Sequence, residues 1–306
     1  MKILITGATG LIGSRFVEFF KADFDLKAVL VKEEKIDIPY IVCDLTNGQA
    51  IQNLVFGEAP DIILHLAAFT DVDGAQKEKG DQTGSCWQLN VETTARLANL
   101  AREAGAKIVY ISTDFVFDGK FGPYKEDDEV SASPDDISWY SWTKLIGEKA
   151  IQESKAQFLI TRTAYPYRSR YEAKTDFVRN IKKGLEEKSL YPMFTDQFLT
   201  PTFVDNLVRA LALLIKEKQS GLWHVVDSTT LSSYEAALEI ADVFGFDKNL
   251  VKEGSLEEFV KNNPQSAPRP KNGGLKNDKL NQFFKKHGTS MQTFRDALIT
   301  MKGQLS

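Results

Sequence analysis

The stretch KILITGATGLIG, residues 2–13, decides the fold class of this chain. An apolar run, residues 2–6, leads directly into Gly7, Gly10 and Gly13, after which the chain continues as an amphipathic helix. Glycine at a strand-to-helix turn permits a tight bend and a close approach of the backbone to a pyrophosphate. The helix N-terminus adds free N–H groups and a partial positive charge. The stretch therefore predicts a phosphate-binding turn at the start of a parallel sheet.

Short apolar runs alternate with longer amphipathic stretches through the first half of the chain, which is typical of parallel strands joined by covering helices. The expected strands are residues 2–6, 26–31, 40–43, 61–65, 107–112 and 158–162. The expected helices lie near residues 11–21, 47–56, 85–104 and 139–153. Such a chain folds as a doubly wound α/β sheet, whose ligands bind beyond the carboxyl ends of the strands.

The rhythm changes after about residue 164, where a polar, irregular segment is followed by mainly helical patterns. We expect a smaller, mostly helical C-terminal part that returns one helix and one strand, residues 221–227, to the sheet. The predicted domains are a dinucleotide-binding domain of residues 1–164 plus about 203–228, and a substrate-binding domain of about 165–202 and 229–306.

Composition excludes several classes of function. The 306 residues include 42 acidic and 38 basic side chains, with a formal net charge of -4 and no concentrated Lys/Arg block. Nucleic-acid or membrane-surface binding is therefore not expected. Two cysteines, Cys43 and Cys86, are too few for a disulfide framework, and the first residues do not read as a signal peptide. We expect a soluble, cytoplasmic protein.

The residues after the second and third expected strands bear on the choice of dinucleotide. A carboxylate after the second strand favours a bare ribose, whereas a basic residue favours a 2'-phosphate. Lys32 is followed by Glu33 and Glu34, so NADPH and NADH both stay open, as does the alternative of three solvated turn charges. Asp44, next to Leu45, either accepts a hydrogen bond from the adenine amino group or caps the helix that follows.

A candidate catalytic set follows the fifth expected strand. Tyr140 and Lys144 are one helical turn apart on one face, and Thr113 stands at the carboxyl end of that strand. A neighbouring ammonium is expected to lower the pKa of the tyrosine, and a threonine hydroxyl can hold a carbonyl oxygen. A Tyr-x-x-x-Lys pair also occurs by chance. The structural alternatives are that Thr113 caps a turn, Tyr140 packs on the helix flank and Lys144 is solvated.

Five stretches along nearly the whole chain carry a family resemblance. They are TGATGLIG (6–13), STDFVFDG (112–119), YSWTK (140–144), DQ with TPT (196–202) and APRP (267–270). On these stretches the chain resembles the extended short-chain dehydrogenase/reductase family and, within it, the dTDP-4-dehydrorhamnose reductases. The glycine turn and the Tyr/Lys pair are typical of the whole superfamily, whereas the second and fourth stretches are specific to the reductase branch.

The resemblance implies a Rossmann-type reductase that passes hydride from NADPH or NADH to C4 of a nucleotide-linked 4-keto-6-deoxy sugar. Tyr140 would protonate the alkoxide, Lys144 would hold the nicotinamide ribose and tune Tyr140, and Thr113 would orient the carbonyl. The predicted substrate-side residues are Asp114, Phe115 and Arg269. The predicted cofactor-binding residues are Gly7, Thr9, Gly10, Leu11, Ile12, Gly13, Lys32, Asp44, Leu45, Leu66, Ala67, Ala68, Tyr140, Lys144 and Tyr165.

Departures from the family keep alternatives open. Residues 162–168 read RTAYPYR where the family usually has RTSWVYG, so a wall of the substrate pocket is altered. Asp114 is followed by Phe115, not by the Glu of nucleotide-sugar dehydratases, which favours plain carbonyl reduction. The alternatives are another sugar-nucleotide epimerase or reductase, and a non-catalytic subunit like the regulatory subunit of methionine adenosyltransferase. No metal ligand is predicted, use of a divalent metal stays open, and a homodimer would fit.

Overall fold

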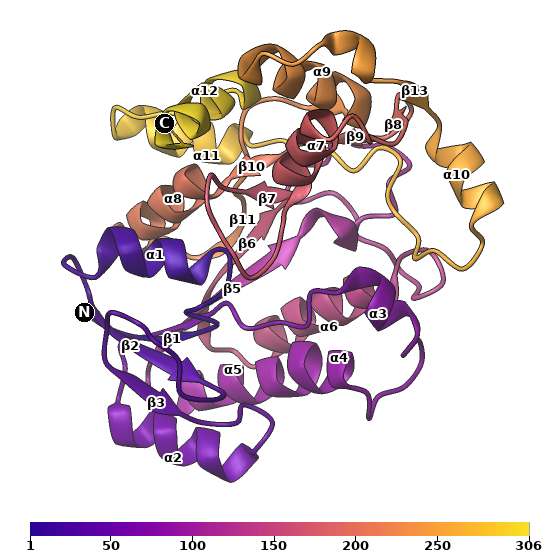
Figure 1. The fold of residues 1–306 in the computed structure, drawn as a ribbon. Coiled ribbons are helices and arrows are strands. Elements are labelled where there is room, and N and C mark those ends of the chain that lie inside the picture. Colours follow the sequence, from indigo (N-terminus) through magenta and orange to yellow (C-terminus); the bar gives the residue numbers. More distant parts are fainter. Residues whose placement is uncertain (306) are drawn as a thin grey trace.

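A computed structural model describes residues 1–305 of the chain. Its centre is a sheet of seven parallel strands in the spatial order β11-β6-β5-β4-β1-β2-β3 (Figure 1). The strands are β1 Lys2–Thr6, β2 Asp25–Leu30, β3 Tyr40–Val42, β4 Ile62–His65, β5 Lys107–Thr113, β6 Gln157–Thr163 and β11 Gly221–His224. The order reverses between β1 and β4, so the doubly wound α/β prediction is confirmed.

Helices cover both faces of the sheet because side chains alternate along each buried strand. Ile3 and Ile5 of β1 face one apolar core, while Leu4 between them faces the other. The first core is covered by α1 Gly13–Phe20, α8 Val204–Lys216 and α11 Asp278–Lys286. The second is covered by α2 Gly48–Glu58, α5 Thr93–Glu103 and α6 Trp139–Glu153.

The expected strands of the first half are all present, and the helices differ from expectation in detail. The helix expected near 85–104 consists of α4 Ser85–Trp87, a π-helical turn η1 Gln88–Glu92, and α5. In that turn the Asn90 amide accepts a hydrogen bond from Phe69 N at 2.9 Å and donates to its carbonyl oxygen. The local widening of the helix therefore ties it to the loop after β4.

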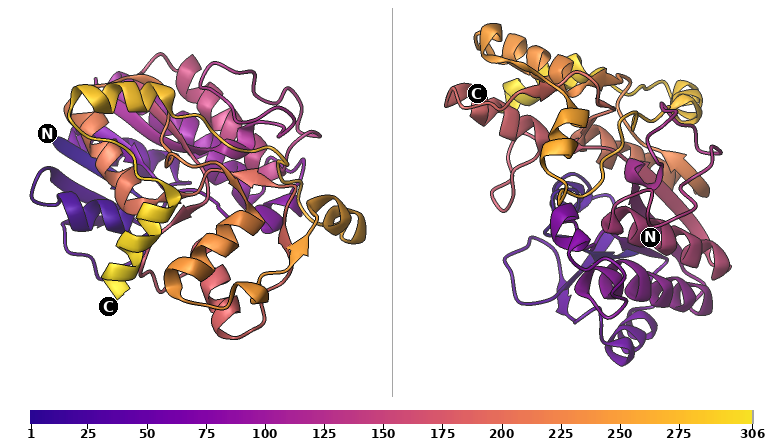
Figure 2. Two further views of the ribbon diagram at one scale, coloured as in Figure 1. Left: turned by 90° about the horizontal axis from the view of Figure 1, so that it is seen from above. Right: turned by 90° about the vertical axis from the view of Figure 1, so that its right-hand side faces the viewer.

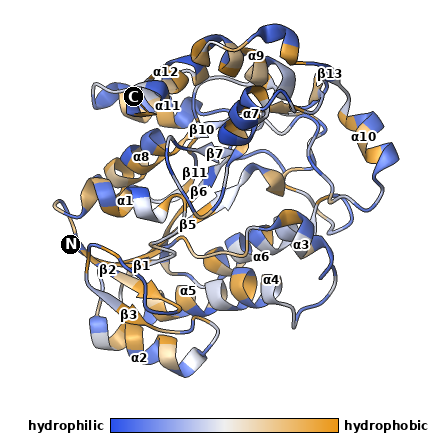
Figure 3. Ribbon diagram, viewed as in Figure 1, coloured by the Kyte–Doolittle hydropathy of each residue, from blue (hydrophilic) through white to orange (hydrophobic). Residues whose placement is uncertain are grey.

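Capping explains where two helices begin. The Asn47 side chain accepts from Ala50 N at 3.1 Å and so caps α2, which means that the alternative in which Asp44 caps this helix is wrong. Ser232 and Glu235 form a reciprocal capping box at the start of α9 Ser233–Phe244. Of the helices in residues 1–305, none is long and apolar enough to span a bilayer, and Figure 3 shows helices with both polar and apolar residues.

The C-terminal half is mostly helical and builds a third apolar core. Its helices α7 Phe177–Glu186, α9 and α12 Phe294–Leu305 gather at the end of the molecule opposite α2 (Figures 1 and 2). Three short strand pairs were not expected: β7 Pro166–Tyr167 with β10 Thr202–Phe203, β8 Met193–Phe194 with β13 Glu253–Gly254, and β9 Phe198–Leu199 with β12 Leu231–Ser232. The remaining short helices are α3 Val72–Gln76, η2 Asp114–Val116, η3 Lys248–Leu250 and α10 Leu256–Asn262.

The expected return of the chain to the sheet is present. Helix α8 packs beside α1, and β11 adds to the free edge of β6 in parallel register. The strand ends at His224, three residues earlier than expected, although Val225 N still donates to Arg162 O at 2.8 Å. The proposed domain boundaries themselves stay a prediction.

Candidate active site

The turn between β1 and α1 has no room for side chains at its first and last glycines. Gly7 has a φ of +69°, and a Cβ on it would lie 2.6 Å from the backbone nitrogen of Ala67. A Cβ on Gly13 would overlap the carbonyl oxygen of Gly7. The Gly10 N–H closes the turn by donating to that same oxygen at 3.0 Å. The result is a bare backbone cradle at a helix N-terminus, which fits a dinucleotide pyrophosphate.

A cavity of about 600 Å³ runs from this turn along the carboxyl ends of the neighbouring strands. This is the edge where a doubly wound sheet is expected to bind its ligands. The predicted site residues that line it are Gly7, Thr9, Gly10, Leu11, Ile12, Gly13, Leu66, Ala67, Ala68, Thr113, Asp114, Phe115, Tyr140, Lys144 and Tyr165. Four predicted residues lie outside its lining, namely Lys32, Asp44, Leu45 and Arg269.

Three of these four have other surroundings. Lys32 is exposed on the loop after β2. The Asp44 carboxylate accepts from both the N–H and the hydroxyl of Thr46 at 2.8 Å, which lowers its pKa. Arg269 donates to Asp73 at 2.9 Å. Their roles in binding stay predictions.

Lys144 is a buried residue of α6 that lines the cavity. It is only 3% exposed. Its ammonium lies 3.9 Å from the centroid of the Tyr110 ring. Burial lowers the pKa of Lys144 to about 7, against the opposing effect of the Glu148 carboxylate. The alternative that Lys144 is a solvated surface lysine is therefore wrong.

Tyr140, one turn earlier, has the opposite shift from the one expected. Burial raises the pKa of Tyr140 above its usual range, the Asp114 carboxylate raises it further, and a hydrogen bond with Thr113 lowers it. The expected lowering of this pKa is therefore wrong in this structure, because desolvation of the phenolate is the largest cause of its shift. Tyr140 is thus a neutral phenol at ordinary pH and holds a proton that it can donate.

Thr113 lies between Tyr140 and a buried carboxyl group. Its hydroxyl donates to Asp114 Oδ1 at 3.0 Å and accepts from Phe115 N at 3.3 Å, so Thr113 caps the short helix η2 and also lines the cavity. Asp114 is 1% exposed, and its Oδ2 has no partner among residues 1–305. Burial raises the pKa of Asp114 to about 7, so this carboxyl group is partly protonated at neutral pH.

One wall of the cavity was not predicted from the sequence. Residues 168–176, here called the strap, cross over the glycine turn before α7 begins, and the Tyr171 hydroxyl donates to the carbonyl oxygen of Thr9 at 3.0 Å. The strap and the start of α7 contribute Tyr171, Lys174, Thr175, Asp176 and Phe177 to the lining. The only signal in the sequence was the departure from the family pattern at Arg168. Other unpredicted lining residues are Thr70, Val72, Leu89, Ile111, Ser112, Thr163 and Pro166.

A metal centre is not evident in the part of the chain that the structure describes. No group of three or more His, Cys, Asp or Glu side chains there could hold a metal ion. His65, beneath the site, is buried between Thr6 and Thr94, at 2.7 Å and 3.0 Å, and burial lowers its pKa to about 3. It is a neutral structural imidazole.

Comparisons with known proteins match the chain from end to end. The profile of one family, the RmlD substrate binding domain, matches residues 1–305. The dTDP-4-dehydrorhamnose reductase of Escherichia coli (strain K12) is 30% identical over 294 residues, covering 93% of this chain and 92% of that protein. The probable low-salt glycan biosynthesis reductase Agl14 of Haloferax volcanii is 26% identical over 311 residues, covering 100% of this chain and 99% of that protein.

Among solved structures, the dTDP-4-dehydrorhamnose reductase (rfbD) of Bacillus anthracis in complex with NADP matches with a TM-score of 0.84 and 28% identity, covering 99% of each chain. Both the sequence and the fold thus match proteins of one kind over their full lengths. The chain therefore belongs to the RmlD substrate binding domain family, within the extended short-chain dehydrogenases/reductases.

Proposed function

We propose that this chain, an NAD(P)-dependent oxidoreductase of the short-chain dehydrogenase/reductase type, reduces the 4-keto group of a nucleotide-linked 6-deoxy sugar. The observation that carries the proposal is the single cavity that joins the glycine turn to Thr113, Tyr140 and Lys144. Relatives from Escherichia coli and Bacillus anthracis bear the name dTDP-4-dehydrorhamnose reductase, which favours a dTDP-linked substrate.

The glycine turn and the residues that follow β4 would hold NADPH or NADH. The solved Bacillus anthracis relative contains NADP, and the absence of any Cβ at Gly7 and Gly13 leaves the backbone open to a pyrophosphate. When bound, the cofactor supplies the hydride that reduces the carbonyl carbon. Leu66, Ala67 and Ala68 add an apolar wall to the cavity beside the turn.

The chain's own residues would stabilise the negative charge on the carbonyl oxygen and supply the proton that it takes up. The Thr113 hydroxyl would turn from Asp114 to the carbonyl oxygen and hold the negative charge that develops there. Tyr140, a neutral phenol, would give its proton to that oxygen. The Lys144 ammonium, one turn away, would then stabilise the phenolate that remains.

The acidic residues of the lining favour reduction over dehydration or epimerisation through C–H proton transfer. Only two carboxyl side chains, Asp114 and Asp176, occur in the described lining. Asp176 is committed to Arg179, whose Nε donates to it at 2.6 Å. Asp114 is followed by Phe115, whose ring contacts Tyr165 edge-on at 5.8 Å. The lining therefore has one carboxyl group without an ion-pair partner, Asp114. It has no pair of carboxyl groups that could transfer protons to and from a carbon atom.

The test is the loss of reduced-nicotinamide absorbance with a panel of 4-keto-6-deoxy sugar nucleotides, with NADPH and NADH assayed separately. Tyr140→Phe should lower turnover by about 10²–10⁴-fold while nearly preserving the dissociation constant of the cofactor, because it removes one hydroxyl group and leaves the glycine turn intact. Tight cofactor binding without turnover of any sugar would refute the proposal and favour the non-catalytic alternative.

A further inference from the structure

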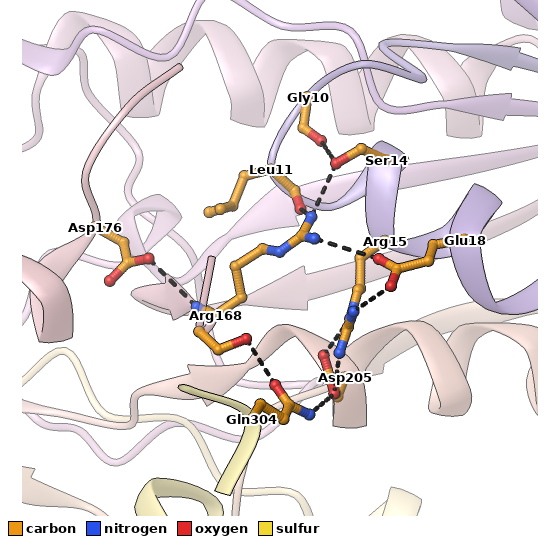
Figure 4. A network of polar contacts seen from close by, with 10 residues as sticks. Gly10, Leu11, Ser14, Arg15, Glu18, Arg168, Asp176, Asp205 and Gln304 are labelled. Atoms are coloured by element: carbon orange, nitrogen blue, oxygen red, sulfur yellow. Dashed lines mark hydrogen bonds and ion pairs between the residues drawn. The ribbon is translucent and has the colours of Figure 1, made fainter. Parts of the chain in front are cut away.

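Arg168, where the family usually has glycine, is buried, and its guanidinium points toward Leu11 and Ser14 (Figure 4). Its Nη1 donates to the carbonyl oxygen of Leu11 at 3.2 Å and to the hydroxyl of Ser14 at 2.8 Å. The Ser14 hydroxyl in turn donates to the carbonyl oxygen of Gly10 at 2.8 Å. One guanidinium from the strap thus holds two consecutive residues of the glycine turn, one directly and one through Ser14.

Tyr171 extends the same contact to a third residue. Its hydroxyl donates to the carbonyl oxygen of Thr9 at 3.0 Å, so carbonyl groups of three successive residues, Thr9, Gly10 and Leu11, are tied to the strap. These are interactions across about 160 positions of sequence. The contacts of the Arg168 guanidinium with Leu11 and Ser14 would be absent if residue 168 were the usual glycine.

The strap is itself held by Asp176, the N-cap residue of α7, and by Arg179 within that helix. Asp176 accepts from the backbone N–H of Arg168 at 3.3 Å and from Arg179 at 2.6 Å. Arg179 also donates to the carbonyl oxygens of Tyr171 and Lys174. The strap is therefore a supported segment, because its backbone is held at Arg168, Tyr171 and Lys174.

Further ion pairs anchor the region around Arg168. Glu18 of α1 forms two ion pairs. Its Oε1 lies 2.7 Å from Nη1 of Arg15, and its Oε2 lies 3.4 Å from Nη2 of Arg168. Asp205 of α8 accepts two hydrogen bonds from Arg15, at 2.6 Å and 2.7 Å, and a third from Gln304 at 2.7 Å (Figure 4). The strap, α1, α8 and α12 thus form one polar network, in which Arg15, Asp205 and Gln304 make no contact with the glycine turn that Arg168 and Tyr171 hold.

Holding the carbonyl groups also aims the amide groups. In a planar trans peptide the C=O of one residue and the N–H of the next point in opposite directions. Fixing Leu11 O therefore turns the Ile12 N–H away from the strap, and fixing Thr9 O keeps the Gly10 N–H directed at Gly7 O. An amide that is already oriented loses less entropy when it binds an anion.

We propose that Arg168 and Tyr171 are positioning residues for the dinucleotide, which hold the glycine turn in its pyrophosphate-binding conformation and so set the affinity for the cofactor. This inference rests on the proposed function, because it requires a dinucleotide at the turn. Neither side chain needs to touch the cofactor for the effect, since both act through the backbone of residues 9–11.

Calorimetric titration tests the inference on the full chain with NADPH, ADP-ribose and AMP as ligands. Arg168→Leu should weaken NADPH and ADP-ribose about tenfold or more, because hydrogen bonds from a charged group are lost. Tyr171→Phe removes one hydroxyl and should weaken both about threefold. AMP has no pyrophosphate, so its dissociation constant should change by less than about twofold in either variant.

Gln304→Ala is the matched control, because it breaks bonds to Ser169 and Asp205 in the same network without touching the turn. It should lower the thermal midpoint slightly and leave all three dissociation constants unchanged. If Arg168→Leu does not fold, Tyr171→Phe decides.

Unchanged dinucleotide affinity in folded Arg168 and Tyr171 variants would overturn the inference alone, as would an equal loss for AMP. Failure of the unaltered protein to bind NADPH or NADH would instead refute the proposed function.

Discussion

At the scale of single residues, the candidate site contains ionisable groups whose buried surroundings disfavour their charged forms. Lys144 is buried with its ammonium over an aromatic ring, and Tyr140 and Asp114 have pKa values raised by burial. The spacing of Tyr140 and Lys144 predicted their shared helix face, but it contained no information on desolvation. Desolvation depends on how β4, β5 and α6 pack together. The direction of the Tyr140 pKa shift could therefore not be predicted from the sequence.

Burial of Lys144 makes stability depend on pH in a definite direction. Its pKa falls from 10.5 to about 7 on folding, so between these values the unfolded chain binds a proton that the folded chain does not. Stability from this residue therefore rises with pH across that window, and the cost of the buried charge is fully felt below about 7.

We expect Lys144→Met to raise the thermal midpoint at pH 6.5, to raise it less at pH 9.5, and to lower turnover at both values. The methionine fills a similar volume without a charge to bury. Lys149→Met on the exposed side of the same helix is the control and should change neither quantity much. A lower midpoint for Lys144→Met at pH 6.5 would show that the ammonium stabilises the fold.

At the scale of elements, the strands were predictable because buried parallel strands are continuous apolar runs. The glycine turn was predictable because local geometry demands glycine there, whatever the rest of the chain does. The strap and the short strand pairs β7 with β10 and β9 with β12 were not, because long-range contacts and not local patterns fix them. The part of the cavity lining that the strap supplies therefore escaped prediction, whereas the glycine turn did not.

Gly13, where the glycine turn enters α1, should respond to a methyl group quite differently from a glycine on an exposed helix face. Gly13→Ala forces a Cβ against the carbonyl oxygen of Gly7, so the free energy of unfolding should fall by about 1–3 kcal/mol and cofactor binding should weaken. Gly57→Ala in α2 places its Cβ in open space and should raise stability by up to about 1 kcal/mol.

Denaturant unfolding of the two variants, together with NADPH titration, checks this pair. Equal effects of the two substitutions would mean that the turn can shift to admit a side chain.

At the scale of the whole molecule, two buried thiols can reveal opening of the fold, because they lie in different apolar clusters. Cys43 follows β3 in the core behind the sheet, and Cys86 lies under α6 with Thr143 at 3.3 Å. Burial raises the pKa of both thiols, so neither is a reactive thiolate in the folded state.

Both cysteines should therefore react with an aromatic disulfide reagent only as fast as the fold opens, and NADPH should slow the reaction further. The measurement is the labelling rate at pH 8 with and without NADPH, and guanidinium-unfolded protein serves as the control for full reaction of the 2 thiols. Immediate labelling of Cys86 in the native protein would mean that α4 and α6 separate locally.

The return of α8 and β11 to the sheet has a consequence for how the protein is made. Ile3, Ile5 and Phe16 leave the ribosome well before α8 and α11, which cover them and end at Lys216 and Lys286. At about 5–20 residues per second, synthesis of the chain between β6 and the end of α11 takes roughly ten seconds. Until α8 and α11 are made, only α1 covers this apolar face of the nascent sheet, which makes the growing chain a substrate for holding chaperones.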